Sequence, residues 1–272
     1  MTLDVQPELV TQLLVSFLRE ETEAAGMRRA VVGLSGGIDS AVVAALCARA
    51  LGAENVLCAL LPYRTSNPRS AADAERLGES LGVPLRRIDI SPIADGYLEG
   101  SRVTDPLRRG NVLARCRMIV LYDLSVEWKG LVIGTSNKTE LLLGYSTQWG
   151  DSAHALNPLG DLYKCQVYQL ARHLDLPRRI IDKPPSADLY EGQTDEGELG
   201  FTYDEADRLL VLMIDKRYSL EELLAAGFSN ELVRRIAGRV VRNQFKRMPP
   251  VIAKLSRRTV GHDFRYLRDW MR

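Results

Sequence analysis

Apolar residues along the chain follow two different patterns. Residues 9–23 carry apolar side chains three and four positions apart, the spacing that predicts an amphipathic helix. Short continuous apolar runs follow at residues 29–34 and 56–61, and again at residues 85–90 and 131–134. Runs of that length are typical of strands that are buried on both faces. The pattern therefore predicts four short strands, with a helix ahead of the first.

Helical patterns fill the intervals between these strands. They cover residues 40–51, 70–81 and 112–128, and Gly52 and Gly82 follow two of them where C-terminal caps are expected. Strands that alternate with helices predict a parallel sheet with helices on both faces. The expected fold class is therefore α/β, with a doubly wound, Rossmann-like parallel sheet.

The pattern changes after residue 144. Residues 145–162 are polar and rich in Gly, Asp and Asn, as is typical of a binding loop. Helical patterns resume at residue 164 and recur at residues 203–215, 219–225 and 230–247. We expect residues 1–272 to form one domain, with an α/β core over about residues 27–190 and helical C-terminal additions over about residues 191–272.

Charged residues nearly cancel, with 36 Lys and Arg against 35 Asp and Glu, which gives a net charge of +1. That balance argues against a general polycation built for nucleic acid or membrane surfaces. It conceals two unlike segments: residues 188–207 hold eight acidic and no basic residues, whereas residues 234–272 hold twelve basic and two acidic ones. We expect the acidic segment to be exposed and mobile.

Nothing in the sequence indicates export or membrane insertion. No apolar run approaches the roughly 18 residues of a spanning helix, and the N-terminus lacks the pattern of a signal peptide, so a cytoplasmic location is expected. The four cysteines stand far apart without a C-x-x-C pair, and we expect reduced, mostly buried thiols. The three histidines are scattered, and we expect surface or packing roles for them.

The loop between the first strand and its helix reads VVGLSGGIDS over residues 31–40 and is the most informative stretch of the chain. Consecutive glycines let the backbone turn tightly and point N–H groups into one concavity at a helix N-terminus, where phosphate binds well. The hydroxyls of Ser35 and Ser40 add donors. The carboxylate of Asp39 suits an anion site mainly when a divalent cation lies between the two, and Mg²⁺ is the expected ion.

A plain strand-to-helix turn is the simpler interpretation of this loop. The loop matches neither G-x-x-x-x-G-K-[ST] nor G-x-G-x-x-G, which weakens P-loop kinase and dinucleotide oxidoreductase interpretations. It resembles the S-G-G-x-D-S pyrophosphate loop of the PP-loop ATP pyrophosphatases, which cleave ATP to AMP and pyrophosphate. The resemblance implies that ATP is bound by Gly33, Leu34, Ser35, Gly36, Gly37, Ile38, Asp39 and Ser40.

Four further blocks narrow the resemblance within that superfamily. They read NVLARCRM, GTSNKTE, GYSTQWGD and KPPSADL, at residues 111–118, 134–140, 144–151 and 183–189. Together with the loop they resemble the NAD synthetases over about residues 9–250. This resemblance implies that ammonia amidates deamido-NAD⁺ (nicotinic acid adenine dinucleotide) at the expense of ATP. The implied route is an acyl adenylate, and the implied products are NAD⁺, AMP and pyrophosphate.

Two residues follow the fourth strand, at the edge where open α/β sheets bind ligands. By resemblance Thr135 contacts ATP, and Glu140 can supply a second carboxylate to a metal ion held by Asp39. The alternative for Glu140 is a carboxylate that merely stabilises the first turn of a helix.

Resemblance also implies ATP contacts for Lys164 and Ser186. Lys164 is one of seven lysines against 29 arginines, and its compact charge suits a phosphate oxygen, although a solvated helix cation is the alternative. Arg115 aligns with the family's contact to the dinucleotide. Ammonium must lose a proton before it attacks, and the expected acceptor is Asp151, whose alternative role is to form a turn beside Gly150. The expected catalytic residues are thus Asp39, Lys164 and Asp151.

Three positions depart from the compact ammonia-dependent members of the family. The chain has Gln148, Ala155 and Phe245-Lys246 where those members carry Lys, Asp and His-Lys at substrate-binding positions. Gln148, Phe245 and Lys246 remain the expected dinucleotide contacts. The T-x-W-G-D and N-x-F-K-R segments resemble instead the synthetase half of glutamine-dependent members, although no amidase domain is expected here. Free ammonium and a separate glutaminase subunit both remain open as nitrogen sources.

The family resemblance implies a homodimer with the dinucleotide near the subunit interface. The apolar faces of residues 113–124 and of the C-terminal helices are the expected contact surfaces. One rival interpretation is another PP-loop ligase, although a tRNA thiolase should show paired cysteines. The other rival is a nucleic-acid-binding module that uses the basic residues 234–272, but few aromatic residues are interleaved there, and we expect no nucleic acid partner.

Overall fold

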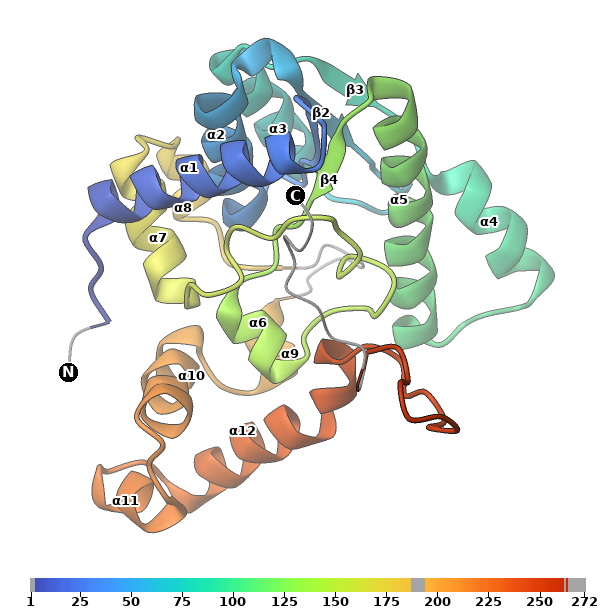
Figure 1. Ribbon diagram of the computed structural model, residues 1–272. Coiled ribbons are helices and arrows are strands. Elements are labelled where there is room, and N and C mark those ends of the chain that lie inside the picture. Colours follow the sequence, from blue (N-terminus) through green and yellow to red (C-terminus); the bar gives the residue numbers. More distant parts are fainter. Residues whose placement is uncertain (1–2, 187–193, 262, 264–272) are drawn as a thin grey trace.

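The computed structural model describes residues 3–186, 194–261 and 263. Its centre is a parallel sheet with the strand order β3-β2-β1-β4 (Figure 1). The strands are β1 (Ala30–Gly33), β2 (Val56–Leu60), β3 (Leu85–Arg87) and β4 (Leu131–Ile133). The chain winds outward from β1 to β3 and then returns to the other side of β1, so the winding reverses between β1 and β4. Open α/β sheets bind their ligands at such a reversal, beyond the carboxyl ends of the strands.

Apolar runs form these strands because each strand is covered on both faces. In β1, Ala30 and Val32 belong to one core and Val31 to the other. Val31 lies level with Leu57 of β2 and with Val132 of β4. This is the doubly wound α/β arrangement that the sequence predicts.

Helices cover the two faces unequally. One core is built with α1 (Pro7–Ala24), α2 (Ile38–Leu51), α3 (Pro68–Leu81), α7 (Lys164–His173) and α8 (Arg178–Ile181). The other core is built with α4 (Ser91–Gly100) and α5 (Pro106–Trp128), which stand beside the sheet in Figure 1. The sequence pattern did not predict α4, since its two glycines and its proline resemble a loop.

A third core lies among the C-terminal helices. Its elements are α6 (Lys138–Leu143), α9 (Asp195–Leu199), α10 (Tyr203–Leu210), the π-helical turn Val211–Asp215, α11 (Leu220–Ala225), α12 (Asn230–Arg242) and the 3-10 turn Gln244–Arg247. These elements confirm the predicted helical additions. The prediction missed the short helices α6 and α9. Within the described part of the chain, no helix has both the length and the apolar character needed to cross a membrane.

The packing divides the apolar residues of the predicted dimer surface on α5, over residues 113–124, into buried and exposed ones. Leu113 and Leu124 are buried against the sheet, so the apolar side they mark belongs to the core of this chain. Exposed apolar residues occupy other positions of the same helix, where Ile119, Tyr122 and Val126 are 54%, 40% and 79% exposed. The apolar side of α12 is likewise buried in the third core.

The thiols and imidazoles take the roles expected of them within the described residues. Cys47, Cys58 and Cys116 are buried, Cys165 is half-buried, and none forms a disulfide. The His154 ring packs against Gly134, and His173 is exposed. His262 lies outside the described residues.

Candidate active site

The glycine-rich loop leaves the carboxyl end of β1 and begins α2 at Ile38. Its two serine hydroxyls hold the loop itself in shape. Ser40 Oγ accepts a hydrogen bond from the Ser35 amide at 3.2 Å and donates one to the Gly37 carbonyl at 3.0 Å. Ser35 Oγ accepts from the Gly37 amide at 3.2 Å. These contacts fix the direction in which the backbone amides point.

Gly36 occupies a position that no other residue fits. Its φ is +79°, in the left-handed region that disfavours a side chain, and a Cβ placed there would lie 2.2 Å from the Ser70 carbonyl oxygen of α3. The loop is therefore pressed against the start of α3. Gly37 caps α2 without any side-chain hydrogen bond, so the first amides of α2 remain available to an anion.

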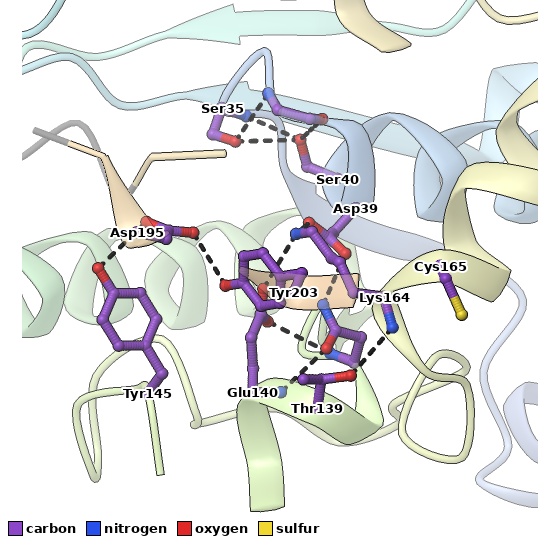
Figure 2. Close-up of polar contacts among 12 residues, drawn as sticks. Ser35, Asp39, Ser40, Thr139, Glu140, Tyr145, Lys164, Cys165, Asp195 and Tyr203 are labelled. Atoms are coloured by element: carbon purple, nitrogen blue, oxygen red, sulfur yellow. Dashed lines mark hydrogen bonds and ion pairs between the residues drawn. The ribbon is translucent and has the colours of Figure 1, made fainter. Parts of the chain in front are cut away.

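Asp39, Lys164 and Glu140 meet at the mouth of this loop (Figure 2). Lys164 Nζ lies 2.6 Å from Asp39 Oδ2 and 3.2 Å from Glu140 Oε1. The Lys164 side chain is 2% exposed, and the two carboxylate side chains are 17% and 15% exposed. The residues come from the starts of α2, α7 and α6 respectively, so the cluster joins three helix N-termini at the reversal of the sheet.

Asn137 connects the two carboxylates. Its amide nitrogen donates to Asp39 Oδ1 at 2.9 Å, while its Oδ1 accepts from the Glu140 backbone amide at 3.0 Å as the cap of α6. Glu140 returns the contact through Oε2, which accepts from the Asn137 amide at 3.4 Å. Glu140 thus stabilises the first turn of α6 by completing a capping box, and its carboxylate also contacts the Lys164 ammonium.

Burial shapes the electrostatics of this cluster. Loss of water raises the pKa of Glu140 to about 7, although the Lys164 ammonium opposes that rise. Burial would by itself lower the pKa of Lys164, but Asp39 and Glu140 outweigh it and raise that pKa above the ordinary lysine value. Lys164 is therefore a permanent cation held between two carboxyl groups.

The donor set fits a magnesium ion that shares its coordination with a phosphate. No group of three or more His, Cys, Asp or Glu side chains within the described residues is arranged to hold a metal. Two carboxylates nevertheless converge on one point, which the Lys164 ammonium now neutralises. Mg²⁺ is commonly bound by one or two carboxylates together with water and substrate phosphates, which is the set that Asp39 and Glu140 offer.

Two acids of the segment that was expected to be exposed are buried, whereas Glu198, Asp204 and Glu205 are exposed as expected. Asp195 and Asp207 are 5% and 0% exposed, and Tyr203 Oη donates to Asp195 Oδ2 at 3.0 Å. The Tyr203 ring lies 5.0 Å from Lys164 Nζ, and Tyr145 Oη lies 3.1 Å from Asp195 Oδ1 (Figure 2). Two tyrosine hydroxyls thus donate to Asp195, and the Thr139 hydroxyl and the Cys165 amide donate to Asp207. Residues 188–193 lie outside the described residues.

The sequence and the structure of this chain are similar to those of known proteins. The family model described as NAD synthase matches residues 10–250. The chain belongs to the NAD synthase family. A relative named NH(3)-dependent NAD(+) synthetase, from Chlorobium phaeobacteroides (strain BS1), is 54% identical over 262 residues, which make up 96% of this chain and 95% of the relative.

Two solved structures share the NAD synthase fold over nearly their whole length. NMN synthetase from Francisella tularensis has a TM-score of 0.83 at 35% identity, and the match covers 92% of this chain and 99% of that one. NH3-dependent NAD synthetase from Campylobacter jejuni, in complex with the nitrate ion, has a TM-score of 0.80 at 37% identity and covers 92% and 100% of the two chains.

Several residues that the family resemblance assigns to the dinucleotide gather on the loop of residues 144–151. Arg115 Nη2 donates to the Gln148 carbonyl at 3.2 Å. Lys246 Nζ donates to the carbonyls of Gly144 and Ser146 at 2.7 and 2.6 Å. Phe245 is 56% exposed. Lys246, in the basic segment of residues 234–272, therefore binds the loop of residues 144–151 through two backbone carbonyls.

The remaining predicted residues are Thr135, Ser186 and Asp151. Thr135 follows β4, which pairs with β1, so it lies at the same sheet edge as the loop. Ser186 is the last residue described before residue 194. Asp151 is exposed, and its Oδ1 accepts from the Thr147 amide at 2.7 Å as a turn-forming residue does. Although the residue as a whole is exposed, protein atoms crowd its carboxyl group, and this desolvation raises the pKa while the hydrogen bond from the Thr147 amide lowers it.

Sequence reasoning missed the residues behind the cluster. Thr139, Asp195, Tyr203 and Asp207 are buried there, and none stands in the glycine-rich loop. Asp195 and Asp207 were counted only as charges of an acidic segment. The one available signal was the position of Asp207, between Ala206 and the apolar pair Leu209 and Leu210 on an amphipathic helix.

Proposed function

We propose that this chain amidates deamido-NAD⁺ with ammonia in an ATP-dependent reaction that passes through an acyl adenylate. The observation that carries the proposal is the meeting of Asp39, Lys164 and Glu140 beside the glycine-rich loop, at the reversal of a parallel sheet. A site that combines open helix amides, a buried cation and two carboxylates suits a triphosphate with its divalent ion.

In the first step the nicotinate carboxylate attacks the α-phosphorus of ATP, because a delocalised carboxylate is too poor an electrophile to react with ammonia. The bond to pyrophosphate breaks, and the acyl adenylate forms. The free amides at the start of α2 and the ammonium of Lys164 stabilise the charge that develops on the leaving pyrophosphate. Mg²⁺, which Asp39 and Glu140 would hold, supplies further charge stabilisation of this kind.

In the second step ammonia attacks the acyl carbon and AMP leaves. Ammonium predominates at neutral pH, so a base must take one of its protons before the attack. Asp151 is our proposed acceptor, since it stands on the loop that Lys246 and Arg115 hold, and desolvation raises its pKa above the ordinary value of an aspartate.

The test supplies purified protein with ATP, Mg²⁺ and deamido-NAD⁺, and compares ammonium with glutamine as nitrogen donor. We expect NAD⁺ and AMP in equal amounts with ammonium. Product from glutamine only when a second protein is added would identify a separate glutaminase subunit. Failure to form NAD⁺ at saturating ammonium would refute the proposal.

Nicotinic acid mononucleotide is a second candidate substrate. The structural similarity to NMN synthetase and the departures at Gln148, Ala155 and Phe245 favour testing it. The same assay with the mononucleotide in place of the dinucleotide decides between them. A larger kcat/KM for the mononucleotide would replace deamido-NAD⁺ as the assigned substrate.

We also propose that the chain acts as a homodimer through the exposed side of α5. Ile119, Tyr122 and Val126 recur at positions i, i+3 and i+7, so they form one apolar stripe on that helix. Exposed apolar stripes of this kind mark association surfaces.

A further inference from the structure

Asp207 is a completely buried carboxylate at the centre of α10, and both of its oxygens accept hydrogen bonds from other helices. Thr139 Oγ1 of α6 donates to Oδ1 at 2.5 Å. The backbone amide of Cys165, in α7, donates to Oδ2 at 2.8 Å. Hydrogen bonds to a charged, buried group are among the stronger ones in proteins.

The two residues that donate to Asp207 are each adjacent in sequence to a residue of the proposed ATP site. Thr139 precedes Glu140 in α6, and Cys165 follows Lys164 in α7. Thr139 Oγ1 also accepts the backbone amide of Lys164 at 3.0 Å. A hydroxyl can donate only one hydrogen bond. Because Thr139 donates its hydrogen bond to Asp207, its lone pairs remain available to accept the backbone amide of Lys164.

The first turn of α7 depends on this arrangement. Its cap residue is Tyr163, which offers no side-chain hydrogen bond as Ser, Thr, Asp or Asn would. The amides of Lys164 and Cys165 are among the donors that a helix start leaves unsatisfied. Asp207 satisfies one directly and the other through Thr139, so a residue 42 or 43 positions further along the chain caps the helix that carries the site lysine.

We propose that Asp207 is a positioning residue that, with Thr139, fixes the Lys164 ammonium relative to Asp39 and Glu140 for binding the ATP phosphates. This inference rests on the proposed function. A displacement of about 1 Å at a reacting group can lower a rate by about 100-fold. Loss of the hydrogen bonds that Asp207 accepts should therefore lower the reaction rate.

The decisive variant is Asp207→Asn, which keeps the size of the side chain but cannot accept from both donors. We expect KM for ATP to rise about tenfold and kcat to fall, while KM for deamido-NAD⁺ and for ammonium stays unchanged. Asp204→Asn is the matched control, because Asp204 lies on the same helix with its side chain 71% exposed and forms a surface ion pair with Arg208. It should behave as wild type.

Thr139 supplies a second test that does not remove a buried charge. Thr139→Val deletes the hydroxyl and should reproduce the selective rise in KM for ATP. Thr139→Ser keeps the hydroxyl and should show a smaller rise in KM for ATP. If both Asp207→Asn and Thr139→Val lower only the folded fraction or kcat, with KM for ATP as in wild type, the role is structural and the inference is wrong.

Binding of Mg-ATP by calorimetry separates this inference from the proposed reaction. If wild type forms no amidated product yet binds Mg-ATP, the proposed function fails while the comparison of wild type with Asp207→Asn still decides the positioning role. Equal affinities of the two proteins for Mg-ATP would overturn the inference.

Discussion

The ammonium of Lys164 lies 2.6 Å from a carboxylate oxygen of Asp39, a residue 125 positions earlier in the chain. The lysine is almost fully buried, and its charge is tolerated because Asp39 and Glu140 surround it. A buried charge without partners is unfavourable, so each member of this cluster depends on the others.

Replacement of Lys164 by methionine should therefore reduce both activity and stability. It removes the cation proposed to bind phosphate and leaves two carboxyl groups facing each other. We expect the free energy of unfolding at neutral pH to fall by about 3 kcal/mol, as for other broken buried pairs, and NAD⁺ formation to fall by more than about 100-fold. Urea denaturation and steady-state rates measure the two effects. Lys216→Met, at an exposed lysine, is the control, and an equal loss there would contradict the assignment.

The raised pKa of Glu140 predicts a pH-dependent stability of the ligand-free protein. Glu140 holds its proton up to about pH 7 in the folded state, whereas the ordinary pKa of a glutamate is 4.5. Between these values the folded state binds more protons than the unfolded state, so this group makes the free energy of unfolding decrease as pH rises, with no further change above pH 7.

Glu140→Gln removes this titration, and denaturation midpoints measured at several pH values should decline less steeply across that window than in wild type. Glu221→Gln, at an exposed carboxylate on α11, should retain the wild-type slope. Parallel slopes for wild type and Glu140→Gln would show that another group is responsible.

Gly36→Ala should damage ATP binding more than it damages the fold. The new methyl group would meet the Ser70 carbonyl oxygen at 2.2 Å, and φ at this position is +79°. Strain of this kind costs about 1–3 kcal/mol and displaces the loop amides that face the phosphates. Gly82→Ala isolates the backbone term, because its φ is +69° and its Cβ would meet nothing within 4 Å. The measurement is KM for ATP, which should rise only in Gly36→Ala.

The sequence was sufficient for the parts of the structure that are local. The apolar runs predicted all four strands because a doubly covered sheet requires them, and the loop at residues 31–40 marked the candidate site because its S-G-G-x-D-S pattern stands between a strand and a helix. Asp39 and Glu140 were expected to share a metal ion, and the structure brings both carboxylates to the Lys164 ammonium.

The parts that failed depend on distant contacts. The composition of residues 188–207 describes a charged, exposed segment, yet Asp207 is buried because Thr139 and Cys165 supply donors to it. The apolar face of residues 113–124 was expected at a subunit interface, although only the packing of α5 decides that Leu113 and Leu124 cover the sheet while Ile119 stays exposed. No periodicity in the sequence carries that information.

Ile119→Glu should dissociate the proposed dimer. A charge placed in the middle of an apolar contact must be desolvated, which weakens association by about 100-fold. Sedimentation velocity across micromolar concentrations measures the effect. Ile93→Glu, at a 44% exposed position on α4, controls for the added charge. If wild type is monomeric throughout, the stripe on α5 is not a dimer surface.

Asp151→Asn separates the two chemical steps. Asparagine keeps an oxygen that can accept the Thr147 amide, so the turn is retained while the base is lost. We expect NAD⁺ formation to fall by about 100-fold, the scale of general base catalysis, while the exchange of labelled pyrophosphate into ATP in the presence of deamido-NAD⁺ stays near the wild-type rate. Asp175→Asn, at an exposed position beyond the other end of α7, should leave both rates unchanged. Equal losses of exchange and NAD⁺ formation in Asp151→Asn would place Asp151 in the architecture of the loop and exclude it as the proton acceptor.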